Sequence, residues 1–196
     1  SKASEVQNGM CFQSRPTVRD HAGTFFWKSK DITMTSLDIH FLHGFGMVGQ
    51  HSENITMDDV DFEAPKESGR TTAGYADFVQ MSGCKGTINI SNCTFAGPHD
   101  DPINIHGTFN TVTAISSDRR TITVQYNHNE TAGFPNFFEG DEIEFMTKGN
   151  MITVEDSVRT VTKVDGPDGM GGNMGDGSGS LTTIKLTLNE AVPSDV

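Results

Sequence analysis

The sequence is poor in tryptophan, tyrosine, cysteine and positive charge. Its 196 residues hold one Trp, two Tyr and three Cys, and 14 Lys plus Arg stand against 26 Asp plus Glu, for a formal net charge of −12. A shortage of positive charge disfavours binding to phosphate backbones and anionic lipids. No apolar run approaches the roughly 20 residues of a membrane span. We therefore expect an acidic protein with neither a nucleic-acid partner nor membrane insertion.

Helical periodicity is also missing. Short segments of alternating apolar residues are broken throughout by Asn, Gly, Ser and Asp, which predicts an all-β chain. The cysteines are odd in number, and Cys93 occupies a core position of the repeat described next, so we predict a small buried apolar side chain and no disulfide. The chain opens in polar sequence without a signal peptide, and we expect it to be a piece of a longer protein.

A short pattern repeats along the first half of the chain. Ile32, Ile55 and Ile88 each begin one copy, and the starts are 23 and then 33 residues apart. Periods of this size indicate stacked supersecondary units, and units built only of short strands predict coils of a right-handed parallel β-helix. The longer copy carries extra polar residues with Gly and Pro at 64–74, which we expect to bulge out as a loop.

The pattern changes after residue 110. We assign residues 1–110 to the β-helix coils and residues 111–196 to a small inserted antiparallel β-barrel, because the later β-rich runs lose the repeat spacing. These runs are residues 111–116, 121–127, 141–146, 151–164 and 181–188. Residues 166–180 contain seven glycines and predict a mobile loop. That loop lacks the ligand alternation and closing Glu of an EF-hand, so it does not predict a calcium site.

Three aspartates come together in this arrangement. A 24-residue offset pairs Val79 with Ile103, and the same offset pairs Asp77 with Asp101. Strands of neighbouring coils lie about 4.8 Å apart, so these two carboxylates should be vertical neighbours, with Asp100 one residue away. Like charges this close raise at least one pKa, which suits an acid and a base. Inverting hydrolysis of a glycosidic bond needs such a pair, about 6.5 to 9.5 Å apart.

Polar residues around the aspartates are candidates for binding a sugar. Arg70 precedes Asp77 in the extra loop, and a guanidinium can fork onto a carboxylate or sugar hydroxyls. The other predicted substrate-binding residues accompany the Asp-Asp pair, and they are His99, Asn104 and His106. No spacing of His, Cys and Asp predicts a metal site, and we expect no cofactor. An Asp at a coil corner can instead cap backbone amides, which is the structural alternative for each aspartate.

These motifs resemble a known family. GRTTAGYADFVQMSGCKG at residues 69–86 and HDDPINIHG at residues 99–107 are similar to the bacterial alpha-1,3-galactosidases of glycoside hydrolase family 110, and the likeness continues in residues 125–134 and 140–145. The resemblance implies a catalytic β-helix with an inserted β-barrel and release of terminal alpha-1,3-linked galactose, by inversion and without a metal. It also implies galactose-terminated oligosaccharides or glycoproteins, including blood group B-type glycans, as partners, and a secreted, periplasmic or cell-surface bacterial location.

The resemblance also assigns the aspartates. By position, the three essential aspartates of the family fall on Asp77, Asp100 and Asp101. The polygalacturonase-like β-helix hydrolases also place one Asp a coil below an Asp-Asp pair, and this analogy implies that Asp100 is the general acid and the other two the base. Family members are much longer, so we expect the isolated chain to lack part of its sugar pocket and to be inactive. Unpaired coil faces favour a homo-oligomer.

Two other functions are compatible with an acidic β-helix. A non-catalytic carbohydrate-binding or adhesin module would use the aspartates only to hydrogen-bond sugar, and aromatic platforms would favour it. Before the barrel the chain offers few, with Trp27 its only tryptophan. A polysaccharide lyase would need a Lys or Arg base with calcium, and only Arg70 precedes the acids closely. We rank both below a glycoside hydrolase.

Overall fold

The protein is almost entirely β-structure. The computed structural model describes residues 2–12, 19, 21–128, 131, 135–167 and 183–196. Two short 3₁₀ helices, η1 (Lys2–Glu5) and η2 (Lys66–Ser68), accompany the strands in these residues. No helix in the described ranges is long and apolar enough to cross a membrane. The glycine-rich segment predicted as a mobile loop, residues 166–180, lies outside the described residues except for its first two positions.

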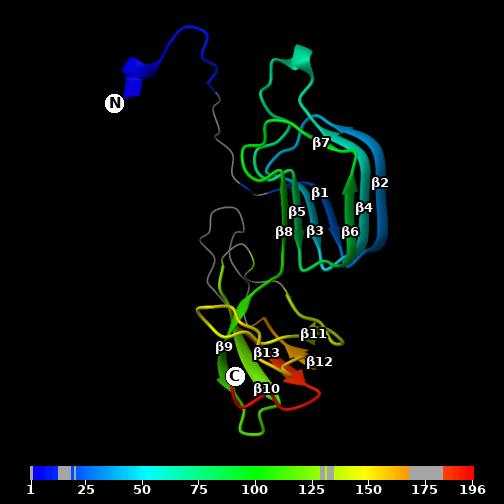
Figure 1. The fold of residues 1–196 in the computed structure, drawn as a ribbon, viewed down its shortest axis with the longest axis vertical. Helices are drawn as coiled ribbons and strands as arrows, with labels where there is room; N and C mark the ends of the chain where they lie inside the picture. Colours follow the sequence, from blue (N-terminus) through cyan, green and yellow to red (C-terminus); the bar gives the residue numbers. More distant parts are fainter. Residues whose placement is uncertain (1, 13–18, 20, 129–130, 132–134, 168–182) are drawn as a thin grey trace.

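Two parallel sheets make up the first half of the chain, which we call the parallel part (residues 22–106). The first sheet contains, in spatial order, β1 (Ala22–Trp27), β3 (Phe45–Gln50), β5 (Val79–Ser82) and β8 (Ile103–His106). The second contains β2 (Lys30–Ile39), β4 (Glu53–Phe62) and β6 (Lys85–Ser91), with β7 (Thr94–Phe95) also paired to β4. The chain alternates between the sheets, so each strand pairs with a strand about one circuit later (Figure 1).

The strand register of the parallel part matches the sequence repeat. Ile32 pairs with Ile55 and Ile55 with Ile88, so the predicted interior column is confirmed. The alignment of Val79 with Ile103 is also confirmed. Side chains between the two sheets form one apolar core, in which the Phe62 ring stacks between two other rings at centroid distances of 5.4 and 5.1 Å, those of Phe78 and Phe95.

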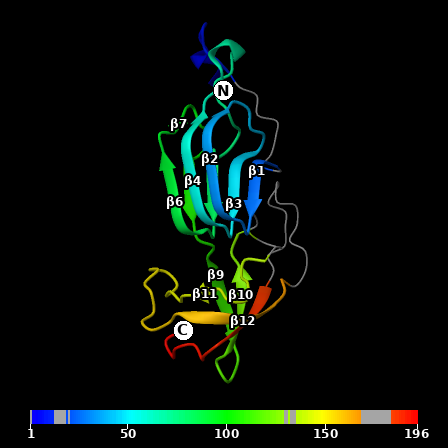
Figure 2. The same cartoon turned by 90° about the vertical axis from the view of Figure 1, so that its right-hand side faces the viewer.

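The loop predicted at residues 64–74 is present between β4 and β5. It contains η2, which ends at Gly69 in the left-handed conformation. Figure 2 shows the loop projecting from the end of the parallel part that lies farthest from the second half of the chain. Cys93 is partly buried against the apolar core, as predicted.

The second half of the chain, which we call the antiparallel part (residues 110–188), has its own sheet. The strands, in spatial order, are β11 (Glu142–Ile143), β12 (Arg159–Asp165), β13 (Thr183–Leu188), β10 (Thr121–Tyr126) and β9 (Asn110–Ile115). Its apolar core is separate from that of the parallel part and surrounds the fully buried ring of Tyr126. Burial raises the pKa of this phenol to about 12.

The predicted strands at residues 141–146 and 151–164 are too long. Only Glu142–Ile143 and Arg159–Asp165 are strands there, and residues 146 and 153 form an isolated antiparallel bridge. The segment between them turns instead, because Gly149, Met151 and Asp156 have φ angles of 106°, 56° and 52° in the left-handed region. Residues 152–154 therefore pair with residues 145–147 in a short irregular hairpin and not with the sheet.

The two parts meet at the ring of Phe138. Lys28 Nζ lies 3.7 Å from its centroid, and the His51 ring meets it edge-on at a centroid distance of 5.1 Å. Trp27 lies on the same side, at 6.2 Å between centroids. Burial lowers the pKa of His51, against the opposing charge of Asp141. We call this contact the aromatic joint (Trp27, Lys28, His51 and Phe138).

Candidate active site

The outer face of the four-stranded parallel sheet forms the floor of a cavity of about 720 Å³. Parallel pairing in register places side chains in rows across β1, β3, β5 and β8. The first row is Phe25, Val48, Gln80 and Asn104, and the second is Trp27, Gln50, Ser82 and His106. All eight side chains line the cavity. The intervening residues of β3 and β5, Met47, Val79 and Met81, point into the apolar core, which fixes the direction of both rows.

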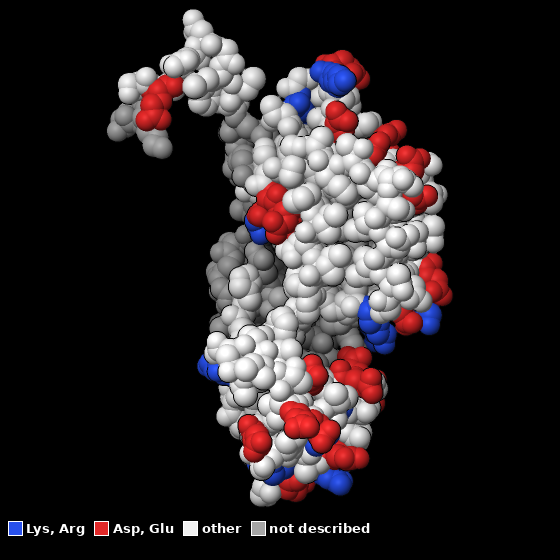
Figure 3. All heavy atoms as spheres, viewed as in Figure 1, with Lys and Arg blue, Asp and Glu red and all other residues white. Residues whose placement is uncertain are grey.

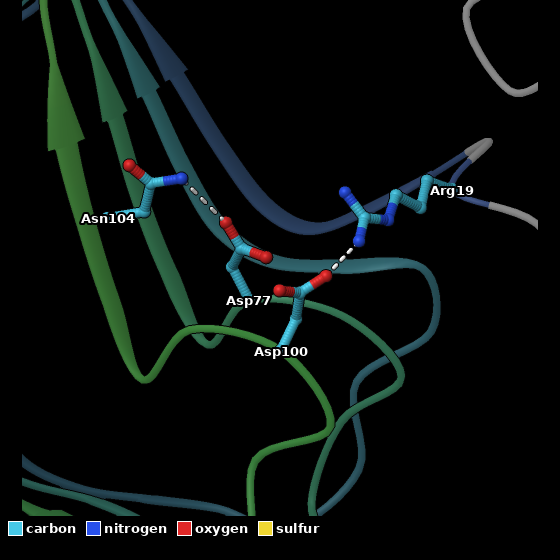
Figure 4. A network of polar contacts seen from close by, with 4 residues as sticks. All are labelled: Arg19, Asp77, Asp100 and Asn104. Atoms are coloured by element: carbon cyan, nitrogen blue, oxygen red, sulfur yellow. Dashed lines mark hydrogen bonds and ion pairs between the residues drawn. The ribbon is translucent and has the colours of Figure 1, made fainter. Parts of the chain in front are cut away.

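Asp77 lies at one end of this floor, directly ahead of β5. Its carbonyl oxygen accepts a hydrogen bond from the Gly46 amide at 2.8 Å, which ties it to the neighbouring strand. The side chain is only 3% exposed, and Asn104 Nδ2 donates to Oδ2 at 3.1 Å (Figure 4). The second oxygen, Oδ1, is buried without a hydrogen-bond partner among the described residues. This carboxyl group therefore has one oxygen whose hydrogen-bonding capacity the described residues leave unused.

Burial raises the pKa of the Asp77 carboxyl group above its ordinary value. The charges of Asp100 and Asp101 act in the same direction, while the hydrogen bond from Asn104 and the charge of Arg19 oppose the rise. A carboxyl group that keeps its proton to higher pH is suited to general acid catalysis.

Asp100 and Asp101 lie on the loop that leads into β8, and this loop runs beside Asp77. The amide of Phe78 donates to the carbonyl oxygen of Asp101 at 3.1 Å, so the two backbones are stacked as predicted. The Asp101 side chain is exposed. Asp100 forms an ion pair with Arg19, whose guanidinium also lies 5.3 Å from the Phe45 ring centroid and lines the cavity. Figure 4 shows Asp77 and Asp100 side by side, between Asn104 and Arg19.

His106 and Gln80 present polar atoms along the floor. His106 Nδ1 contacts the Gly107 carbonyl oxygen at 2.9 Å, and since a carbonyl only accepts, Nδ1 carries the hydrogen. The other ring nitrogen, Nε2, can then accept from Gln80 Nε2 at 3.4 Å. Gln80 Oε1 is buried without a partner among the described residues. The floor thus presents the polar side chains of Gln80 and His106 to the cavity.

Two predicted binding residues lie elsewhere. The Arg70 guanidinium stacks over the Phe41 ring, 4.4 Å from its centroid, and does not line the cavity. The structure therefore places the Arg70 side chain against an exposed aromatic ring outside the cavity lining. His99 also lies outside the cavity lining, whereas Asn104 and His106 belong to it.

Sequence reasoning missed Arg19, Phe25 and Gln80. Phe25 and Gln80 could have been found by extending the repeat, because parallel register maps Phe25 onto Val48 and Val48 onto Gln80. Arg19 precedes the first strand and belongs to no repeat, so no signal in the sequence pointed to it. Among the described residues, no group of three or more His, Cys, Asp and Glu side chains could hold a metal ion.

Known proteins with similar sequences help to interpret this geometry. The family described as GLAA-B beta-barrel domain II matches residues 121–167. Alpha-1,3-galactosidase A of Streptomyces avermitilis is 48% identical over 194 residues, which are 99% of this chain and 30% of that protein. The enzyme of the same name from Peterkaempfera griseoplana is 45% identical over 96% of this chain and 26% of its own length. The chain belongs to the alpha-1,3-galactosidase family.

Membership of the alpha-1,3-galactosidase family confirms the resemblance seen in the sequence motifs. A third relative, alpha-1,3-galactosidase A of Bacteroides thetaiotaomicron, is 46% identical over 143 residues, which are 73% of this chain and 25% of that protein. The chain spans less than a third of the length of these relatives. It therefore corresponds to a part of an alpha-1,3-galactosidase that includes the aspartates and the sheet after them.

Proposed function

We propose that this chain carries the acidic residues of an exo-acting, inverting alpha-1,3-galactosidase that releases terminal galactose from glycans. The observation that carries the proposal is the buried Asp77 carboxyl group, with its raised pKa, beside Asp100 at the end of an open cavity. Family membership supplies the linkage and the sugar. The substrates are galactose-terminated oligosaccharides or glycoproteins, including blood group B-type glycans.

In the proposed reaction, one carboxyl group protonates the glycosidic oxygen and another takes a proton from the attacking water. The analogy with other β-helix hydrolases gives the acid role to Asp100 and the base role to Asp77 with Asp101. Two observations support a different donor: burial favours the protonated form of Asp77, and Asp100 pairs as a carboxylate with Arg19. Variants of each aspartate distinguish these assignments, because loss of the acid is rescued by a good leaving group and loss of the base is not.

We further propose that the two parallel sheets are faces of a right-handed parallel β-helix. The alternation of strands between the sheets and the in-register columns support it. Residues 1–110 and 111–196 are then two domains, the second a β-barrel. The separate apolar cores and the family match at residues 121–167 support that division.

Location and assembly are part of the same proposal. Glycans ending in galactose are displayed outside the cytoplasm, which supports a secreted, periplasmic or cell-surface enzyme. The formal charge of −12 agrees with a glycan partner in place of a nucleic acid, and the face shown in Figure 3 carries scattered acidic groups and few basic ones. Ile103 and Ile105 on the edge strand β8 are exposed, which supports association with another copy or a further coil.

The test is hydrolysis of an alpha-1,3-galactosyl disaccharide by the full-length protein, with the released anomer followed by NMR. Inversion of an alpha-linked galactoside gives beta-galactose first. Initial release of alpha-galactose would contradict inversion, and no release of galactose would contradict the activity.

A second candidate, a non-catalytic carbohydrate-binding module, is favoured by one observation. Three exposed aromatic side chains line the cavity, Phe25, Trp27 and Phe109. Tight binding of the disaccharide by the full-length protein without hydrolysis would identify this function.

A further inference from the structure

The end of the cavity farthest from Asp77 is aromatic. Trp27 and Phe109 line it and are 47% and 57% exposed, and Phe25, which is 57% exposed, lies one row nearer Asp77, level with Gln80. Large apolar side chains gathered in a concave site are typical of ligand binding, since their exposure to water is otherwise unfavourable. The opposite end holds Asp77 with its free carboxyl oxygen. The cavity therefore has a charged end and an aromatic end.

The two ends are too far apart for one sugar ring to touch both. Asp77 precedes Ser82 by five residues of extended chain, which span about 16 Å at about 3.3 Å per residue. Ser82 lies in the same row as Gln50 and Trp27. A monosaccharide held by the carboxyl groups cannot reach the Trp27 ring, whereas the next sugar of a glycan extends toward it over the polar floor.

Trp27 is held in place before any sugar arrives. On the antiparallel side, the Phe138 ring is tilted by 60° to the indole, and Lys28 Nζ lies 5.9 Å from the indole centroid. The antiparallel part also contributes His128, Thr131 and Pro135 to the cavity lining. A fixed aromatic ring binds a flat apolar sugar face with little loss of side-chain entropy. The aromatic joint thus orients one wall of the cavity.

We propose that Trp27, with Phe25 and Phe109, forms a subsite for the saccharide to which the terminal galactose is attached. The galactose lies at the aspartates, and the apolar face of the attached sugar stacks on the aromatic rings. The antiparallel part then has a role in substrate selection, because Phe138 positions Trp27. This inference rests on the proposed galactosidase function, and it predicts that the subsite distinguishes oligosaccharides from free galactose.

Trp27 also provides the measurement, because it is the only tryptophan of the 196-residue chain. We would titrate the full-length protein, carrying Asp100→Asn to prevent cleavage, with alpha-1,3-galactobiose and with free galactose, and record calorimetric binding together with the tryptophan emission that is lost in a Trp27→Phe reference protein. The disaccharide should change the emission of Trp27 to saturation, and galactose at equal occupancy should leave it nearly unchanged. Equal changes with both sugars, no change at disaccharide saturation, or no binding of either sugar would overturn the subsite.

A matched pair of variants tests the energetic role. Trp27→Ala should weaken calorimetric binding of the disaccharide about tenfold, the loss expected for one well-packed aromatic contact, and leave the affinity for galactose unchanged. Phe41→Ala removes a ring that is 56% exposed but lies outside the cavity, and should change neither affinity. An equal effect of Trp27→Ala on both sugars, or no effect, would contradict the subsite. Failure of the proposed galactosidase function gives a different result. The full-length protein would then release no galactose, even if Trp27→Ala selectively weakens its affinity for the disaccharide.

Discussion

The parallel and antiparallel parts are built from the same kind of strands but differ in what their surfaces can do. In the parallel part, in-register pairing repeats a position from strand to strand, so residues far apart in sequence line up in rows such as Phe25, Val48, Gln80 and Asn104. In the antiparallel part, register shifts interrupt two of the pairings, between β10 and β9 and between β12 and β13, whereas in the parallel part a shift occurs between β4 and β6 and none occurs in the sheet that forms the floor. A stack of parallel strands therefore assembles a broad polar floor, and the antiparallel sheet contributes a wall.

The two parts also have separate apolar cores. Each part buries its own apolar cluster, and the contact between the parts is made by the few side chains of the aromatic joint. The proposed catalytic residues all lie on the parallel part, since Asp77, Asp100 and Asp101 precede or follow its strands. Separate cores predict that stability is local to each part, whereas the proposed subsite makes substrate selection depend on both.

The largest expected effect comes from removing a carboxyl group of the parallel part. In the full-length protein, Asp100→Asn should lower kcat on an unactivated disaccharide by several orders of magnitude, because its proton transfer acts mainly in the transition state, while galactoside binding changes little. Steady-state kinetics with a disaccharide and a nitrophenyl galactoside measure this. If the variant keeps much of its turnover on the nitrophenyl substrate, Asp100 is the general acid. Near-normal turnover of the disaccharide would exclude a catalytic role for Asp100.

The next effect separates the two cores. Ile55 and Ile184 are both fully buried, the first in the parallel part and the second in the antiparallel part. Truncation of either to Ala should cost about 2 to 5 kcal/mol. Hydrogen exchange should show Ile184→Ala loosening the amides of β10, β12 and β13 while β3, β4 and β5 keep their protection. Uniform loss of protection in both parts would show that the cores unfold as one unit.

The sequence predicted the parallel part better than the antiparallel part, for a physical reason. In parallel coils the register follows from apolar spacing alone, which is how the column of Ile32, Ile55 and Ile88 and the stacking of Asp77 on Asp101 could be found. In the antiparallel part, turns such as the one at Met151 interrupt apolar alternation through backbone angles that composition does not reveal. The contact of Arg70 with Phe41 depends on the path of a loop, which no repeat constrains.

A smaller effect tests how tightly the parallel part holds Asp77. A Cβ added to Gly46 would overlap the Phe78 carbonyl oxygen and lie 2.8 Å from the carbonyl oxygen of Asp77. Gly46→Ala should therefore destabilise the protein by about 1 to 3 kcal/mol in denaturant titration and lower galactoside affinity by displacing Asp77. Gly107→Ala is the matched control for the change in stability alone, because its Cβ would meet nothing closer than 3.7 Å but Gly107 itself lines the cavity. If both variants behave alike, close packing at Gly46 does not position the acid.

The smallest effect is a pH-dependent gain in stability when Asp77 is replaced. Burial raises the pKa of Asp77 in the folded protein above its ordinary value of 3.8, so the folded state holds this proton more tightly than the unfolded state. The contribution of this carboxyl group to the free energy of unfolding is then fully present below pH 3.8 and is lost as the pH rises through the folded-state pKa. An Asn side chain at position 77 does not titrate, and its amide oxygen can still accept the hydrogen bond from Asn104. Asp77→Asn should thus have the same Tm as the unchanged protein near pH 3 and a higher Tm at neutral pH.

Thermal unfolding of both proteins across that pH range measures the difference, and other titrating groups cancel because the two chains share them. A matched variant, Asp101→Asn, removes an exposed carboxylate of the same cluster and controls for the loss of one negative charge there. A Tm difference for Asp77→Asn that stays constant with pH would mean that the carboxyl group titrates alike in both states. If the difference grows as expected, the parallel part retains a destabilising buried acid at its cavity, which is the cost expected of a group kept for catalysis.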